Sequence, residues 1–212
     1  SDPLEVRLNK ILAEVRERIE YNGLEINASP LDPAPDRVLV EGSGDAFDIA
    51  LTLVAAFRRV GLESTTALVN SGCGTDVEPR LPGFGLFNHA LVRVTPGPGL
   101  DPVWIDPIAP YSRPGELPLA AQGRFALIIG PDTEKPILTP ATDPEDNLAR
   151  ETRKIYFSDF GPGRIVERCE YFGSAERSQR RITAGLEDEA RRRGYRAYVH
   201  AFHRAAELGA LR

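Results

Sequence analysis

The sequence predicts an α+β protein in which a mostly apolar helix packs on an antiparallel sheet. Apolar residues recur at helical spacing near the amino terminus, over 4–19, and again over 45–61. Residues 87–94 alternate in the manner of a half-buried strand, and a short turn separates them from a second β-prone run at 103–107. Two helices and an antiparallel strand pair are therefore expected in one domain.

The amino-terminal part predicts two helices with a loop between them. The first helix presents one apolar stripe, formed by Leu4, Leu8, Ile11, Leu12, Val15 and Ile19. The prolines of 28–36 forbid a continued helix and predict an extended surface connection. In the second helix, Asp45 is expected as the N-cap and Gly61 as the C-cap glycine, which puts Ala46 in the first turn.

The middle of the chain predicts the strands. Residues 65–70 form a short β-prone run, and a loop rich in glycine and proline follows it. Because 87–94 and 103–107 are joined by a short connection, they are expected to pair antiparallel and to bring His89 close to Asp106. A third strand is expected at 125–129.

The domain boundaries follow from composition. We expect a core over 1–136, a linker rich in turn formers and acids over 137–150, and a β-hairpin with one or two helices over 151–212. A hairpin and a helix cannot close a core, so the last segment is expected to dock on the core or to begin a β-rich domain that is truncated at Arg212.

Composition excludes several classes of function. A net charge of −5, with charges of both signs interspersed, gives no basic stripe for nucleic acid, and no apolar run reaches the roughly 20 residues of a membrane span. A soluble domain is expected. The two cysteines leave the compartment open, and the lack of any methionine predicts a piece of a longer chain.

Three blocks of sequence carry a family resemblance. They are the segment from Gly44 to Ala50 with its continuation to Glu63, the segment Phe87–Val94, and Trp104–Pro107. In this order they resemble the core of the transglutaminase-like family, of the papain-type superfamily. The segments 67–71, 115–118 and 122–129 further resemble a bacterial subgroup in which this core lies between β-rich domains, which would place the parent protein at the cell envelope or in the periplasm.

The resemblance implies a papain-like core with cysteine chemistry. A thiolate at the head of the nucleophile helix would attack an amide or ester carbonyl of a peptide or protein bound in a cleft, His89 would carry the proton, and Asp106 would orient the imidazole. Ala46 stands where the cysteine belongs, so the chain as given is expected to be inactive. No cofactor or metal is implied. Tyr21, Asp45 and Asn88 are candidates for supporting or oxyanion-binding roles.

The sequence is compatible with other interpretations. Ala46 is either a deliberate replacement or a natural loss; the family-like surroundings of His89 favour the first, and Phe47, where relatives often have lysine, favours the second. The chain could be a pseudoenzyme that binds peptide or protein, or a structural spacer. Cross-linking, deamidation and hydrolysis are not distinguished, with hydrolysis as the default.

Each candidate residue also has an ordinary structural interpretation. Tyr21 could be a core tyrosine with a satisfied hydroxyl, and Asp106 before Pro107 could simply start a turn. Cys73 is considered as a replacement nucleophile and disfavoured because its loop offers no helix N-terminus. Cys169 is expected to pack in a strand.

Overall fold

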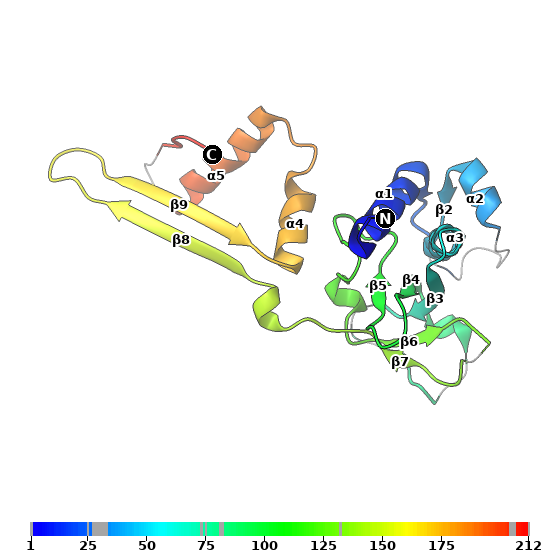
Figure 1. Cartoon of the computed structure of the whole chain (residues 1–212). Coiled ribbons are helices and arrows are strands. Elements are labelled where there is room, and N and C mark those ends of the chain that lie inside the picture. The colour runs from blue at the N-terminus through cyan, green and yellow to red at the C-terminus, as the bar shows by residue number, and fades with distance from the viewer. Residues whose placement is uncertain are drawn as a thin grey trace. The chain divides into compact units, whose positions relative to one another are not determined.

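The computed structural model describes residues 2–24, 26, 34–72, 74, 76–80, 83–131, 133–203 and 207–211 (Figure 1). It divides into two compact units, Ser1–Asn147 and Leu148–Arg212, and each is described by itself. The division falls inside the segment 137–150 that the sequence predicts as a linker.

Three helices lie together on one side of the sheet in the first unit (Figure 1). They are α1 (Leu4–Arg18), α2 (Pro35–Glu41) and α3 (Ala46–Arg59). The two long helices agree with the sequence prediction. The expectation of an extended connection up to residue 36 is wrong for its last two residues, because Pro35 occupies the first turn of α2, where its missing N–H costs nothing. Residues 27–33 of that connection lie outside the described part.

The main sheet has the strand order β5-β4-β3-β6-β7, and every neighbouring pair is antiparallel. Its strands are β3 (Glu63–Val69), β4 (His89–Thr95), β5 (Val103–Ile105), β6 (Phe125–Ile128) and β7 (Ile137–Leu138). A short parallel pair, β1 (Glu20–Tyr21) with β2 (Ser43–Gly44), lies just before α3. The described part of the unit also contains three single-turn 3-10 helices: Phe84–Leu86, Leu119–Ala121 and Pro144–Asp146.

The sheet buries apolar side chains on both faces. On one face Ala90, Val92 and Val94 of β4 join the large cluster formed with α1 and α3. On the other, Leu91 joins a smaller cluster with Trp104 and the 3-10 helix of Leu119–Ala121. This is the alternation of a strand that is buried on both sides. The predicted α+β class is confirmed, and helices packed on a curled antiparallel sheet are consistent with a papain-like core.

The second unit is a hairpin followed by two helices. The hairpin pairs β8 (Ala149–Tyr156) with β9 (Arg164–Tyr171), and the helices are α4 (Ser174–Thr183) and α5 (Asp188–Phe202). Among the described residues of this unit no side chain is fully buried. Cys169 is exposed on β9, so the expectation that it packs in a core is wrong.

None of the helices in the described part of the chain has the length and apolar character needed to cross a membrane.

The first unit depends on the side chains that α3 buries against the sheet. Phe57 is fully buried, and we expect Phe57→Ala to lower the free energy of unfolding by about 3–5 kcal/mol, because it removes a large apolar contact and leaves a cavity. Urea denaturation followed by circular dichroism measures the change. Val40→Ala, at a side chain that is 88% exposed, should change stability by less than about 0.5 kcal/mol. Equal effects of the two changes would contradict this account of the core.

Candidate active site

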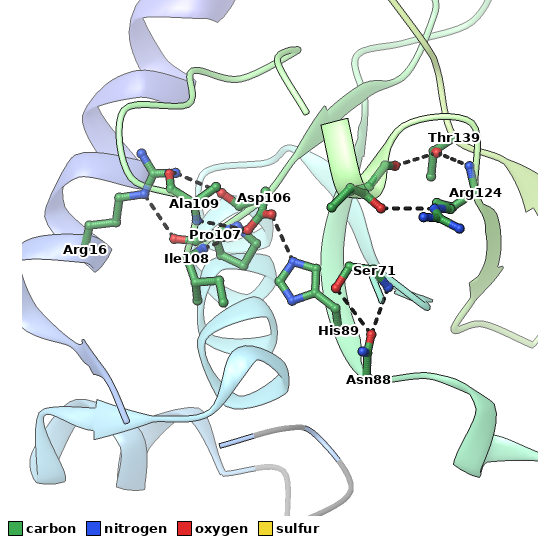
Figure 2. A network of polar contacts seen from close by, with 12 residues as sticks. Arg16, Ser71, Asn88, His89, Asp106, Pro107, Ile108, Ala109, Arg124 and Thr139 are labelled. Atoms are coloured by element: carbon green, nitrogen blue, oxygen red, sulfur yellow. Dashed lines mark hydrogen bonds and ion pairs between the residues drawn. The ribbon is translucent and has the colours of Figure 1, made fainter. Parts of the chain in front are cut away.

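A buried histidine and a buried aspartate meet at one end of the sheet. His89 is the first residue of β4, and Asp106 follows the last residue of β5. Because Arg93 pairs with Trp104 and side chains alternate along each strand, His89 and Asp106 project from the same face. His89 Nε2 lies 2.9 Å from Asp106 Oδ2, and the two side chains are 10% and 5% exposed (Figure 2).

The carboxylate of Asp106 is fixed by its own turn. Its second oxygen, Oδ1, accepts hydrogen bonds from the backbone N–H groups of Ile108 at 3.1 Å and Ala109 at 3.0 Å. Since a carboxylate only accepts, the Nε2 atom of His89 carries the shared proton. The imidazole Nδ1 then holds a lone pair that can accept a proton from another group.

Ala46 lies at the same end of the first unit as this pair. It is the first residue of α3, which turns back into β3 after residues 60–62, and β3 ends at Val69, the register partner of His89. The 14 residues of α3 extend about 21 Å and the 7 residues of β3 about 23 Å, so the start of the helix is level with the start of β4. Ala46 is 1% exposed and belongs to the large core cluster that α3 forms with the sheet, which includes Ala90, the residue after His89.

The start of α3 is capped by two acids. Asp45 Oδ1 accepts from the backbone N–H of Phe47 at 2.8 Å and of Asp48 at 2.9 Å, and Asp48 Oδ2 accepts from the N–H of Asp45 at 3.4 Å. The predicted N-cap is confirmed as a reciprocal capping box. The cap occupies the N–H groups of Phe47 and Asp48, so these two are not free to bind an oxyanion.

The same acids determine the local charge. Burial raises the pKa of Asp48, and the nearby charge of Asp45 raises it further. The positive end of the helix dipole is therefore opposed by negative charge beside Ala46. A thiolate at that position would need a cation such as a protonated His89 to stabilise it.

Asn88 and Tyr21 hold backbone segments beside the site. Asn88 Oδ1 accepts from the N–H of Ser71 at 2.9 Å and from its hydroxyl at 3.3 Å, which fixes the chain after β3 (Figure 2). Tyr21 pairs with Gly44 in the short parallel ladder, and its hydroxyl donates to the Leu24 carbonyl at 3.3 Å. The alternative of a core tyrosine is wrong, because Tyr21 is 40% exposed.

Cys73 lies outside the described residues. In the described part of the chain, no three histidine, cysteine, aspartate or glutamate side chains cluster as a metal site would require.

Arg16 of α1 is a component of the site that the sequence analysis missed. Its guanidinium donates to four backbone carbonyls in the loop that begins at Asp106. Figure 2 shows Arg16 beside Asp106, Pro107 and Ala109 of this loop. Burial lowers the pKa of Arg16, and the charge of Asp106 opposes that shift. The signal available in the sequence was only an arginine next to the apolar stripe of a helix, which is usually a solvated residue.

A cavity of about 850 Å³ lies at the opposite end of the sheet. It is lined by residues at the end of α3, the start of β3 and the end of β4, among them Arg58, Glu63 and Thr95. Because β3 runs from this cavity toward the level of His89, the cavity is separate from the His89 and Asp106 pair.

Comparison with known proteins finds little that resembles this chain. No protein-family model matches it, and no curated protein matches it. A similar solved structure is the crystal structure, at 2.00 Å resolution, of a putative protease from Parabacteroides distasonis ATCC 8503. The two have a TM-score of 0.48 and 15% sequence identity over 67% of this chain and 25% of that one. This chain therefore spans about a quarter of the length of that protein.

The raised pKa of Asp48 predicts a pH-dependent difference between the parent chain and Asp48→Asn. A carboxyl whose pKa is higher in the folded state than its ordinary 3.8 binds its proton more tightly when folded, so its contribution to stability is lost as pH rises through that window. Asparagine has no such loss. We expect the stability of Asp48→Asn relative to the parent to increase between about pH 3 and about pH 7, measured by urea denaturation at each pH. A relative stability that falls over this range would contradict the assignment.

Proposed function

We propose that the first unit is a transglutaminase-like domain built for thiol-dependent acyl transfer or amide hydrolysis, and that it is inactive because Ala46 occupies the nucleophile position. The observation that carries the proposal is the 2.9 Å contact between the buried His89 imidazole and the buried Asp106 carboxylate. The position of Ala46 at the head of α3, level with His89, supports it.

The chemistry follows from what each group can do when residue 46 is cysteine. The His89 Nδ1 atom accepts the thiol proton, and the sulfur attacks the carbonyl carbon of the substrate. The amine leaves with the proton that the imidazole returns, and a thioester remains on the sulfur. A water molecule or a second amine then attacks the thioester, which releases an acid or a new amide. Asp106 keeps the imidazole in the tautomer that this sequence of proton transfers requires.

Alanine at position 46 lacks only the sulfur that would form a bond with the substrate. A methyl group cannot ionise or form a thioester, but the remainder of the proposed site is unaffected by its presence. The chain is therefore expected to bind a peptide or protein amide without turning it over, whether the alanine was introduced deliberately or arose naturally. The codon for residue 46 in the parent gene distinguishes these two origins.

The proposal predicts an unusually reactive thiol in Ala46→Cys. Near pH 6, where an ordinary cysteine is almost entirely protonated, an ion pair with His89 would keep the thiolate populated. We expect iodoacetamide to alkylate residue 46 of this variant at least about tenfold faster than the exposed Cys169 of the same chain, followed by mass spectrometry of peptides.

Two control variants show whether a fast alkylation of residue 46 depends on its position and on His89. Val40→Cys places a thiol on an exposed side chain of the neighbouring helix α2 and should react at the rate of Cys169. Adding His89→Ala to the Ala46→Cys variant should remove the enhancement. The proposal fails if A46C reacts no faster than V40C. A buried thiol without an ion pair has a raised pKa, and its alkylation is therefore slow.

A further inference from the structure

We propose that Arg16 is a positioning residue that aims the Asp106 carboxylate at His89. Its meaning for catalysis rests on the function proposed above, whereas its effect on the histidine–aspartate contact does not. The inference starts from an unusual use of one side chain: a single partly buried guanidinium holds a loop that is about 90 residues away in sequence.

The hydrogen bonds of Arg16 go to one loop. Nε donates to the Pro107 carbonyl at 3.0 Å, and Nη1 donates to that of Ser112 at 2.9 Å. Nη2 donates to the carbonyls of Asp106 and Ala109, both at 2.8 Å. A planar guanidinium offers donors in fixed directions, so these four acceptors fix the path of the loop relative to α1.

The hydrogen bonds within the loop are local ones, from the N–H groups of Ile108 and Ala109 to the Asp106 carboxylate and from the Ser112 N–H to the Ala109 carbonyl. The ladder of β5 ends at Ile105, and the Asp106 side chain must be oriented immediately afterwards. Tyr111 has φ of 63°, a left-handed conformation that a residue with a large side chain adopts only when its surroundings impose it. The Ser112 hydroxyl is buried and finds no hydrogen-bond partner among the described residues. A strained loop with an unsatisfied group needs an external anchor, and Arg16 bonds to both of its ends.

The charge of Arg16 is directed at the backbone. Among the described residues no carboxylate lies within ion-pairing distance of Arg16, although the charge of Asp106 acts on it. Arg18 lies on the same helix, but its side chain is exposed and forms an ion pair with Glu14 at 2.6 Å. Arg18 is therefore a matched control for the loss of an arginine from α1.

The test observes the His89 contact directly, without any nucleophile. In the full chain, the imidazole Nε2–H proton that is bonded to Asp106 should give a downfield nuclear magnetic resonance signal that exchanges slowly with water. His89→Gln identifies the signal by removing it. We expect Arg16→Met and Arg16→Lys to raise the exchange rate at least about tenfold, whereas Arg18→Met leaves it unchanged.

The outcomes separate positioning from general stability. If Arg16→Met does not fold, Arg16→Lys decides the matter, because lysine keeps the charge but its one ammonium group cannot serve four carbonyls in different directions. A folded Arg16→Lys chain with the parent signal and exchange rate would overturn the inference.

A second measurement relates the inference to the proposed function. In the Ala46→Cys chain, Arg16→Lys should slow alkylation at least about tenfold while Arg18→Met does not. If A46C itself shows no enhanced reactivity, the proposed function fails and the exchange rate of the His89 proton still judges Arg16. If A46C is reactive and the Arg16 variants alter neither measurement, only the positioning role fails.

Discussion

The contact between His89 and Asp106 depends on strand register. The two residues are far enough apart in sequence that only the antiparallel pairing of β4 with β5 brings them together, and a shift of one residue would turn one of them to the opposite face. Burial of both faces of β4 penalises such a shift, because Val92 and Leu91 would exchange environments. The packing of the sheet core and the geometry of the site are therefore determined by the same register.

The acidic side chains around the start of α3 reduce the ability of that helix end to stabilise an anionic nucleophile. Asp45 and Asp48 satisfy the backbone donors of the first turn and place negative charge at its head. The usual contribution of a helix N-terminus to a thiolate is thereby reduced. Under the proposed function, His89 would have to supply the positive charge for an anionic group at residue 46, so the orientation of its imidazole would matter more than the helix dipole.

The parts of the fold that could be predicted from sequence are those with a strong local pattern. The apolar stripe of α1, the capping signal at Asp45 and the alternation of 87–94 each depend on residues a few positions apart. The nearness of His89 and Asp106 followed from the short connection between their strands. Helix α2 was missed because Pro35 can equally end a helix or begin one. Arg16 was missed because nothing local links a helix residue to carbonyls contributed by a distant loop.

The long reach of Arg16 also has a consequence for how the protein folds. The α3, β3 and β4 segments are close in sequence and can assemble with small losses of chain entropy, whereas joining α1 to the loop after Asp106 closes about 90 residues of chain. The sheet can thus pair before the loop acquires its final path. A chain shortened at its amino terminus by the length of α1 would keep His89 and Asp106 but lose the four hydrogen bonds from Arg16 to the loop after β5.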